Sequence, residues 1–330
     1  MKILIVGAGA TGGYFGACLA RAGRDVSFLV REKRAGFLAE RGLRITGLEQ
    51  ELRIEPLLFT AATLAQTSPA ETFDVVLLTV KGSALKQAIS DMAPAVGPNT
   101  MIIPFLNGMA HMDALAAAFG AEKVLGSVAH LVGTINADGD IELLSPMASW
   151  TVGEQLDEQL NGQSAEQDRV RNGAQEVELS PRVQALVTEI SVAGFTVIPV
   201  VDARITLWKK WGFIVSAGVI TCLMRGPVGA IAAVPGGKEF VAAVSAEAAA
   251  VAAAAGFALS ETEKADRIEF LTQEGSAFTS SLYRDVTAGL PNEGEHIVGD
   301  FARRAAELGV VTPLIDLALI QLRVHELTRV

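Results

Sequence analysis

The chain carries the sequence Lys2-Ile3-Leu4-Ile5-Val6-Gly7-Ala8-Gly9-Ala10-Thr11-Gly12 near its N-terminus, and this stretch decides the fold. A short apolar run typical of a buried strand leads into glycines spaced G-x-G-x-x-G, and a helical pattern follows over Gly12–Arg21. The first glycine of this motif allows a tight turn, the second lets a pyrophosphate approach the backbone, and the third lets the helix pack on the strand. Glycines in a loop are otherwise simple turn formers, but the flanking strand and helix favour a dinucleotide site with the phosphates on the helix N-terminus. Its predicted residues are Gly7, Gly9, Ala10, Thr11 and Gly12.

The next predicted strand ends in a basic cluster, which indicates the dinucleotide that binds. Ser27-Phe28-Leu29-Val30 is followed by Arg31-Glu32-Lys33-Arg34, about 20 residues beyond the glycines, where an acidic residue would hold the ribose 2′-hydroxyl of NAD. Arg31 at that point matches the 2′-phosphate of NADP, which a carboxylate would repel. We therefore predict NADP(H) rather than NAD, with Arg31 as a cofactor contact. Two alternatives stay open: a shift of one residue would present Glu32, and Arg31 would otherwise be a solvated loop arginine.

Strand-like apolar runs alternate with helical patterns through the first half of the chain, which is typical of βαβ units around a mostly parallel sheet. Two further extended segments resemble an antiparallel extension. Residues 155–178 are polar and predict an exposed loop or insertion, after which Ser180-Pro181 begins a helix. The expected strands are Lys2–Val6, Asp25–Val30, Val75–Thr79, Met101–Pro104, Val124–Val132 and Phe195–Val200, with Ile141–Leu144 and Trp150–Val152 as the extension, and the expected helices are Gly12–Arg21, Ala84–Met92 and Met112–Phe119.

From about Ala203 onward, every segment has a helical pattern. The expected helices cover 203–224, 237–256, 260–274, 276–288 and 292–326, the last broken near Gly309 and Pro313. We therefore expect an α/β N-terminal Rossmann domain over residues 1–201, built on a mostly parallel sheet, and an all-α C-terminal domain over residues 202–330.

The composition of the 330 residues narrows the possible partners. With 27 basic against 37 acidic residues the formal charge is -10, which argues against nucleic acid or an anionic membrane as the main partner. Cys18 and Cys222 lie in apolar segments and predict buried thiols in a reducing compartment, and we expect no metal site. The longest apolar run, Trp211–Met224, is shorter than the roughly 20 residues that span a bilayer, and no signal-peptide layout precedes the glycines. We expect a cytoplasmic protein whose apolar helical half has room for a homodimer interface.

Two further polar side chains follow predicted strands, at the edge where open α/β sheets bind ligands. Lys81, in Leu77-Leu78-Thr79-Val80-Lys81-Gly82, would project over the cofactor. Asn107, in Phe105-Leu106-Asn107-Gly108, offers an amide for a nicotinamide or a substrate oxygen. Taken alone, Lys81 would be a solvated lysine and Asn107-Gly108 a turn.

In combination these motifs resemble the ketopantoate reductase (2-dehydropantoate 2-reductase) family, which reduces a 2-oxo acid with NADPH in pantothenate biosynthesis. The resemblance extends over nearly the whole chain, through Leu207-Trp208-Lys209-Lys210-Trp211 and through Ser280-Ser281-Leu282-Tyr283-Arg284-Asp285-Val286 followed by Pro291-Asn292-Glu293. It implies that Lys210 donates a proton to the carbonyl oxygen, that Ser281 binds the substrate, and that Glu293 contacts the nicotinamide ribose and supports catalysis. It also implies that Asn107 lies between cofactor and substrate, and that Lys81 and Arg31 contact the cofactor.

The implied chemistry agrees with the residue types. Hydride arriving at a ketone carbon leaves negative charge on the oxygen, which an ammonium group stabilises and then protonates. Lys209 is a rival to Lys210 for this role. The apolar helix face that includes Trp211 and Ile214 adjoins Lys210, whereas Lys209 points about 100° away.

The sequence departs from the family at four positions where the family carries asparagines. A pocket that hydrogen-bonds a hydroxylated substrate loses that discrimination when its amides become apolar. We therefore expect a 2-oxo acid with a more hydrophobic side chain than ketopantoate. The alternatives are an NADP-dependent dehydrogenase that oxidises a hydroxy acid or an amino-acid derivative, and a non-catalytic NADPH-binding sensor. The four substituted positions are Ile214, Gly218, Val228 and Phe278.

Overall fold

The structure, a computed structural model, describes residues 1–48, 51–67, 72–156 and 178–329. The chain divides into two compact units: the first comprises Met1–Leu106 and His111–Arg204, and the second comprises Asn107–Ala110 and Ile205–Val330. The polar segment predicted as an exposed loop over 155–178 lies outside the described residues except at its two ends.

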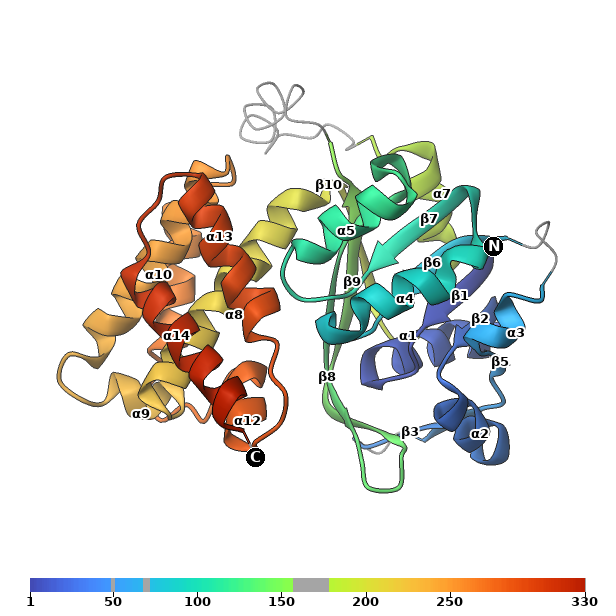
Figure 1. The fold of residues 1–330 in the computed structure, drawn as a ribbon, viewed down its shortest axis with the longest axis horizontal. Coiled ribbons are helices and arrows are strands. Elements are labelled where there is room, and N and C mark those ends of the chain that lie inside the picture. The colour runs from blue at the N-terminus through green and yellow to red at the C-terminus, as the bar shows by residue number, and fades with distance from the viewer. Residues whose placement is uncertain (49–50, 68–71, 157–177, 330) are drawn as a thin grey trace. The chain divides into compact units, whose positions relative to one another are not determined.

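The first unit is built on a five-stranded sheet with the order β5-β2-β1-β6-β7 (Figure 1). Each neighbouring pair in it is parallel, which confirms the predicted parallel sheet. Apolar runs form these strands because both faces of a parallel sheet are covered. The strands are β1 (Lys2–Val6), β2 (Asp25–Leu29), β5 (Leu57–Phe59), β6 (Phe73–Leu78) and β7 (Val96–Pro104), and the helices are α1 (Ala10–Arg21), α2 (Glu32–Arg41), α3 (Ala61–Leu64), α4 (Leu85–Met92), α5 (Ala110–Phe119) and α7 (Pro181–Ile190), with short 3₁₀ turns η1 (Gly82–Ala84), η2 (Ala93–Ala95) and η3 (Ala121–Lys123).

A second sheet accounts for the extended segments that follow the parallel one. Its long strand β9 (Ile141–Glu154) pairs antiparallel with β8 (Gly126–Ile135) and parallel with β10 (Thr196–Asp202) and β3 (Leu43–Thr46). The strand β4 (Leu52–Ile54) then pairs antiparallel with β3. The expectation that the Val124–Val132 strand continues the parallel sheet was therefore wrong. A single parallel bridge between Val124 and Ile102, just before β8, joins this segment to the parallel sheet, and β8 itself pairs with β9.

Helix α1 lies in the core of the first unit, and this position fixes the glycine loop at its start. Its residues from Gly12 to Leu19 are buried on every side. The Phe15 ring makes edge contacts with Phe105 at 5.2 Å, Trp150 at 5.9 Å and Phe195 at 4.8 Å between ring centroids. A helix that is apolar all round is expected where protein covers each of its faces.

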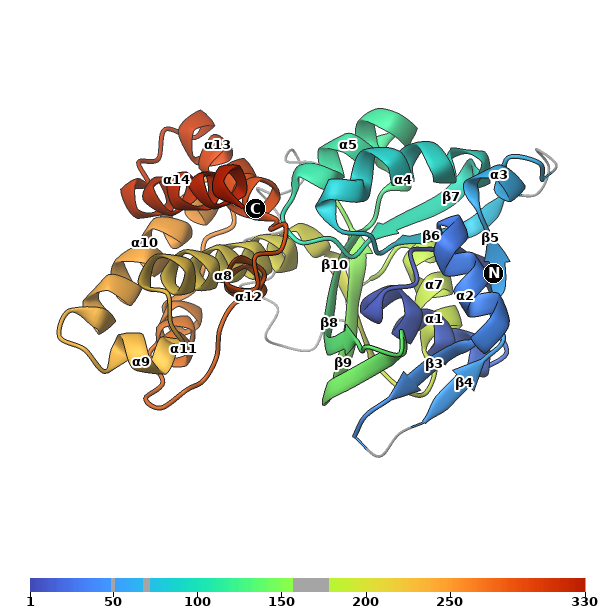
Figure 2. The same cartoon turned by 60° about the horizontal axis from the view of Figure 1, so that its bottom comes forward.

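All regular elements in the described residues of the second unit are helices, as predicted. Its longest helix, α8 (Ala203–Met224), is apolar enough and long enough to cross a membrane by composition alone, but 67% of its most apolar window is buried. The other helices gather around α8 in both views (Figures 1 and 2), as is usual for a core helix. They are α9 (Val228–Ala232), α10 (Gly237–Ala254), α11 (Glu261–Leu271), α12 (Ser281–Thr287), the π-helical turn η4 (Glu295–Gly299), α13 (Asp300–Glu307) and α14 (Pro313–Thr328).

Two of the expected C-terminal helices have different bounds in the structure. The helix expected over 276–288 begins at Ser281, because the Ser280 side chain accepts a hydrogen bond from the backbone N–H of Tyr283 and caps it. The segment 292–326 is divided into η4, α13 and α14. The last break falls at Gly309, which has a φ of 69°, and at Pro313, as predicted.

Candidate functional site

The glycine loop is held at the carboxyl end of three neighbouring strands. Gly7 has a φ of 100°, and its backbone N–H donates to the Leu29 carbonyl at 3.0 Å. The Thr79 hydroxyl lies within hydrogen-bond distance of the carbonyls of Gly7 (2.9 Å) and Val6 (3.0 Å). The loop is thereby fixed between β1, β2 and β6, at the edge where open parallel sheets bind ligands.

Gly12 and Gly9 differ in why their positions require a glycine. A Cβ on Gly12 would lie 2.1 Å from Thr79 Oγ1 and 2.3 Å from the Gly7 carbonyl, so close packing of helix on strand requires this glycine. A Cβ on Gly9 would meet nothing within 4 Å, and its φ of -79° suits any residue. The protein itself therefore does not need a glycine at position 9, whereas a ligand lying against this backbone would need one.

The start of α1 fits a bound phosphate. No side chain caps the helix at Gly9, and its first turn contains no acidic residue. The N–H groups of a first helical turn have no intrahelical acceptor, and the helix dipole favours negative charge there. The residues Gly7, Gly9, Ala10, Thr11 and Gly12 thus form a cradle that suits a dinucleotide phosphate.

The basic cluster divides into an exposed part and a structural part. Arg31 is exposed and is the N-cap residue of α2, and Glu32 is the first residue of that helix. Because Val6 pairs with Leu29, Arg31 emerges at the same sheet edge as the glycine loop. Arg34 instead donates to the carbonyls of Ala8 at 3.3 Å and of Gly139 at 3.0 Å. Its role in holding the loop was missed from the sequence, since Gly139 is distant in the chain.

Lys81 lies three residues beyond the end of β6 and is the N-cap residue of the turn η1. The backbone N–H of Thr79 donates to the Val6 carbonyl at 2.9 Å, so this segment leaves the sheet beside the glycine loop. Lys81 is exposed. The first unit therefore brings the loop, Arg31 and Lys81 to one edge of its parallel sheet.

Three predicted residues of the second unit belong to segments that contact one another. The Trp211 indole donates to the Ile297 carbonyl at 2.9 Å, and the Ile297 N–H donates to the Glu293 carbonyl at 2.9 Å. Gly108, with a φ of 82°, packs so tightly that a Cβ would lie 2.8 Å from the His296 carbonyl. These contacts join the segments that carry Asn107, Lys210 and Glu293. They include the π-helical turn η4, a rare element often found at functional sites.

The structure distinguishes the two neighbouring lysines. Lys209 Nζ forms an ion pair with Glu263 Oε1 at 2.5 Å, and its side chain is 40% exposed. The carbonyl of Lys209 also accepts a hydrogen bond from the buried Arg267 guanidinium at 3.0 Å. At Lys210, burial lowers the pKa of the ammonium to about 8, although part of the side chain reaches solvent. A lysine that titrates near neutral pH suits proton transfer.

Ser281 and the four substituted positions are distributed over α8, the start of α9 and the start of α12. Lys210, Ile214 and Gly218 are spaced by four residues and share one face of α8. A Cβ on Gly218 would lie 3.2 Å from the Leu282 side chain, next to Ser281, which is exposed as the first residue of α12. The Ser280 hydroxyl lies 2.7 Å from that of Thr221 on α8.

Two of the substituted positions, Val228 and Phe278, are joined through the backbone. The Val228 N–H donates to the Phe278 carbonyl at 3.0 Å. The Phe278 ring packs against Phe270 at 5.0 Å and Phe213 at 6.3 Å between centroids. The side chain at position 278 is therefore part of an aromatic cluster.

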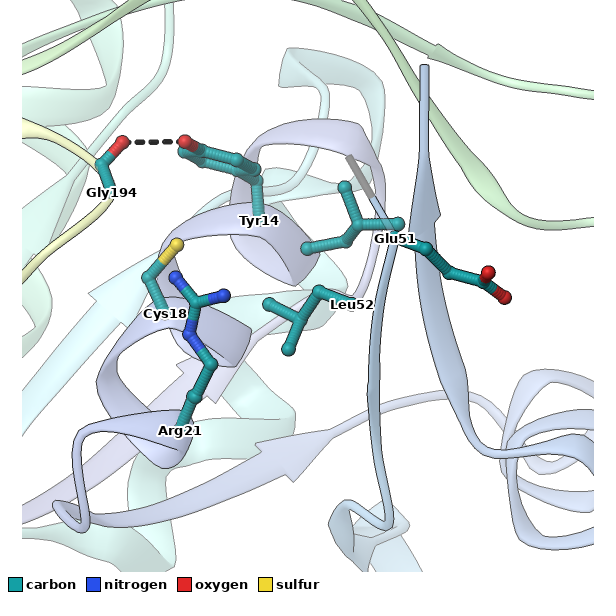
Figure 3. Close-up of a pocket in the computed structure, with 7 residues that line it drawn as sticks. Tyr14, Cys18, Arg21, Glu51, Leu52 and Gly194 are labelled. Atoms are coloured by element: carbon teal, nitrogen blue, oxygen red, sulfur yellow. Dashed lines mark hydrogen bonds between the residues drawn. The ribbon is translucent and has the colours of Figure 1, made fainter. Parts of the chain in front are cut away.

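A separate cavity of about 460 Å³ lies on the other half of α1 (Figure 3). Its lining includes Tyr14, Cys18 and Arg21 but none of the predicted site residues. The Tyr14 hydroxyl donates to the Gly194 carbonyl at 2.5 Å, and burial raises the pKa of Tyr14 to about 12 and also raises the pKa of Cys18. Both groups stay protonated at neutral pH, so neither supplies a phenolate or thiolate nucleophile there. Within the described residues, no group of three or more His, Cys, Asp and Glu side chains is arranged to hold a metal ion.

Comparisons with known proteins agree over both units. The family described as "Ketopantoate reductase PanE/ApbA" matches residues 3–156, and its C-terminal counterpart matches residues 202–326. An "Uncharacterized oxidoreductase YkpB" of Bacillus subtilis is 31% identical over 99% of this chain and 99% of its own length. A 2-dehydropantoate 2-reductase of Mesorhizobium japonicum is 28% identical over 98% of this chain and 97% of its own.

Solved structures share the fold. The 2-dehydropantoate 2-reductase from Methylococcus capsulatus superimposes with a TM-score of 0.81 at 24% identity, covering 99% of this chain and 97% of its own. A D-mandelate dehydrogenase solved with NADH and anilino(oxo)acetate superimposes with a TM-score of 0.79 at 18% identity, and the match covers 99% of this chain and 98% of the dehydrogenase. At these identities the likeness concerns the fold.

Proposed function

The chain belongs to the ketopantoate reductase PanE/ApbA family of oxidoreductases, and from this premise we propose that it reduces a 2-oxo acid with NADPH. The observation that carries the proposal is Lys210, whose pKa burial lowers to about 8, on a segment joined through Trp211 and Ile297 to the segment of Glu293. A proton donor that titrates near neutral pH is what carbonyl reduction requires of the protein.

Each residue of the second unit has a distinct proposed role. A reduced nicotinamide, when bound, supplies the hydride. Protonated Lys210 stabilises the negative charge that develops on the carbonyl oxygen and then transfers its proton there, leaving a neutral amine and a 2-hydroxy acid. The Asn107 amide and the Ser281 hydroxyl orient the 2-oxo acid by hydrogen bonds. Glu293 contacts the nicotinamide ribose.

The first unit supplies the cofactor contacts in this proposal. The glycine loop and the start of α1 bind the pyrophosphate, Lys81 contacts the cofactor at the same sheet edge, and Arg31 pairs with the 2′-phosphate that distinguishes NADP from NAD. The exposed position of Arg31 at that edge supports the last assignment.

We expect Arg31→Ala to raise the KM for NADPH by about 10- to 100-fold, the loss of one charge-assisted contact, with the KM for NADH almost unchanged. Steady-state kinetics with both cofactors checks this. Lys33→Ala is the matched control, because Lys33 is an exposed cation two residues away. Equal effects of the two substitutions, or an equal loss with NADH, would contradict the role of Arg31.

The pKa of Lys210 predicts the pH dependence of the reaction. Reduction needs the protonated amine, so kcat/KM should be constant well below pH 8 and fall about tenfold per pH unit above it. Oxidation of the 2-hydroxy acid needs the neutral amine and should rise over the same range. Rate profiles in both directions between pH 6 and 10 check this, and a reductive profile that stays flat to pH 10 would exclude Lys210 as the donor.

We propose that the substrate is a 2-oxo acid with a more apolar side chain than ketopantoate. The aromatic packing of Phe278 and the buried Val228 and Gly218 support this, because none of these side chains can hydrogen-bond a substrate hydroxyl. The test is NADPH oxidation with ketopantoate, branched alkyl 2-oxo acids and aryl 2-oxo acids in parallel. If none of these 2-oxo acids is reduced although NADPH binds tightly, the result would support the non-catalytic NADPH-binding sensor instead.

A second candidate is a dehydrogenase that works in the oxidative direction on a hydroxy acid or an amino-acid derivative. A lysine with a pKa of about 8 supports it equally well, since a neutral amine can accept the hydroxyl proton. The fold shared with D-mandelate dehydrogenase is compatible with this direction. Rates measured both ways with NADP and with NAD separate the two candidates.

A further inference from the structure

The cavity beside α1 (Figure 3) is built from the first unit alone. Its volume of about 460 Å³ lies within the range of pockets that bind small molecules. Its lining comes from α1, from β3, from the start of β4 and from the turn before β10, and all of these segments belong to the first unit. A ligand in this cavity would therefore occupy a second site, apart from the glycine loop.

The wall of the cavity is mostly apolar. Ile45 is buried and Leu52 is half-buried, and both contribute aliphatic side chains. The Tyr14 hydroxyl is occupied by its hydrogen bond to the Gly194 carbonyl (Figure 3). Burial raises the pKa values of Tyr14 and of the Cys18 thiol, so both groups are neutral at neutral pH. Such a wall suits the hydrocarbon part of a ligand.

The two charged residues at the cavity differ in whether another side chain neutralises them. Glu51 pairs with Arg44 at 3.2 Å between Oε1 and Nη2, and its carboxylate points away from the other labelled side chains (Figure 3). The Arg21 side chain instead runs back along α1 towards Cys18 (Figure 3). Burial raises the pKa of that thiol, and the nearby guanidinium opposes the shift. Among the described residues, Arg21 has no hydrogen-bond or ion-pair partner.

Arg21 is exposed and thus offers an unneutralised cation at the mouth of an apolar cavity. It lies in the last turn of α1, where the helix dipole is negative and disfavours an anion with two charges. A planar guanidinium matches the two oxygens of a carboxylate.

We propose that this cavity binds a small monocarboxylate, with the carboxylate on Arg21 and the apolar body against Ile45 and Leu52. The site shares no residue with the proposed reductase function and does not depend on it.

The two tyrosines of the chain allow a test at a single residue. Tyr14 lines the cavity, whereas Tyr283 lies on α12 of the second unit, two residues beyond Ser281. Protein labelled with 3-fluorotyrosine therefore gives two fluorine NMR signals, which Tyr283→Phe assigns. Titration with 3-phenylpropanoate should shift the Tyr14 signal saturably, with a Kd of about 0.1 to 1 mM, as expected for so small a ligand. A Tyr14 signal that stays in place up to about 10 mM ligand, or movement of the Tyr283 signal alone, would overturn the proposal.

Matched ligands test the charge and the apolar body. The neutral 3-phenylpropanamide should bind at least about tenfold more weakly than the carboxylate, because it cannot form the charge-assisted bond to Arg21. Inorganic phosphate should also bind more weakly, since it leaves the apolar wall uncovered. An amide or a phosphate with the affinity of the carboxylate would contradict the proposed ligand class.

Matched variants test the residues. Arg21→Gln should weaken carboxylate binding by about tenfold or more and leave the acid and the amide with equal affinities. Arg24→Gln is the control and should keep the wild-type affinity, because Arg24 donates to the Glu189 carbonyl at 2.8 Å and does not line the cavity. Leu52→Phe fills part of the cavity and should weaken both ligands, and thermal melting checks that each variant is folded. Equal losses in Arg21→Gln and Arg24→Gln would exclude Arg21 as the binding group.

Lys210→Met separates this site from the proposed reaction. The variant should lose 2-oxo acid reduction and keep the carboxylate titration of the Tyr14 signal unchanged. A chain without reductase activity can therefore still show carboxylate binding at Arg21. Loss of the titration in Lys210→Met would place the carboxylate at the reaction site and overturn the proposal.

Discussion

Lys210→Met should lower kcat for 2-oxo acid reduction by about 10³- to 10⁴-fold, because one substitution removes both the proton donor and the positive charge beside the developing oxyanion. NADPH binding should change by less than about threefold, since the cofactor contacts that we propose lie mainly in the first unit. Single-turnover rates and NADPH fluorescence titration measure the two effects separately.

Lys209→Met is the control for this experiment. Lys209 is paired with Glu263 and is 40% exposed, so its loss should change kcat by less than about threefold and stability by under about 1 kcal/mol. If Lys209→Met were the inactive variant, or if both variants kept wild-type rates, the assignment of the proton donor would be wrong.

Lys210→Met should also stabilise the protein. Burial lowers the pKa of Lys210 from its ordinary 10.5 to about 8, so the folded state disfavours the charged form that the unfolded chain retains at neutral pH. At pH 7 the variant should gain about 2 kcal/mol in the free energy of unfolding. For the same reason the wild-type stability should rise with pH between 8 and 10.5 through this group. Urea unfolding at pH 7 and pH 9 checks both statements.

Gly12→Ala should lower the free energy of unfolding by about 3 kcal/mol or more and remove measurable NADPH binding. A Cβ at position 12 would lie 2.1 Å from Thr79 Oγ1 and 2.3 Å from the Gly7 carbonyl, and a backbone carbonyl cannot move aside as a flexible side chain can. Helix α1 would have to separate from the end of β1, which changes the loop that we expect to hold the pyrophosphate.

Gly9→Ala is the matched substitution, because it adds the same methyl group where no protein atom lies within 4 Å. Its stability should stay within about 1 kcal/mol of wild type, the cost of a poorer N-cap residue. The Kd for NADPH should nevertheless rise by about 100-fold, since the methyl group holds the pyrophosphate away from the N–H groups of α1. Unchanged NADPH affinity in this variant would mean that the cofactor does not lie on the loop.

The sequence predicted most reliably those elements whose signal is local. The strands β1, β2 and β6 are rich in apolar residues, and α8 and α10 carry long helical patterns. Residues 43–59 remained unassigned because β3, β4 and β5 have only three or four residues each, too few for a periodicity to be recognised. The helix α2 (Glu32–Arg41) was also missed, because its start was interpreted only as a basic cluster after a strand. The second sheet was missed as a separate layer because the pairing of β3 with β9 joins residues nearly a hundred positions apart.

The same distinction applies to the candidate site. The glycine loop carries its own local pattern and was predicted with the correct strand and helix around it. The contact of Gly108 with the His296 carbonyl and the bond from Trp211 to the Ile297 carbonyl join distant segments, and no local pattern specifies them. The hydrogen bonds of Arg34 to Ala8 and Gly139 were likewise beyond sequence reasoning. The catalytic and binding roles remain predictions for the experiments above.

Strand β9 has a consequence for how the protein is made. It pairs with β3, which is synthesised about a hundred residues earlier, and with β10, which follows it at Thr196–Asp202. During synthesis β3 can pair with β4 at once but can pair with β9 only about a hundred residues later, and closing so long a loop is slow. A fragment that stops near residue 156, where the first family match ends, would lack β10 and leave part of β9 as an unpaired edge. Such an edge promotes aggregation. A fragment designed to express the first unit alone should therefore extend through Arg204.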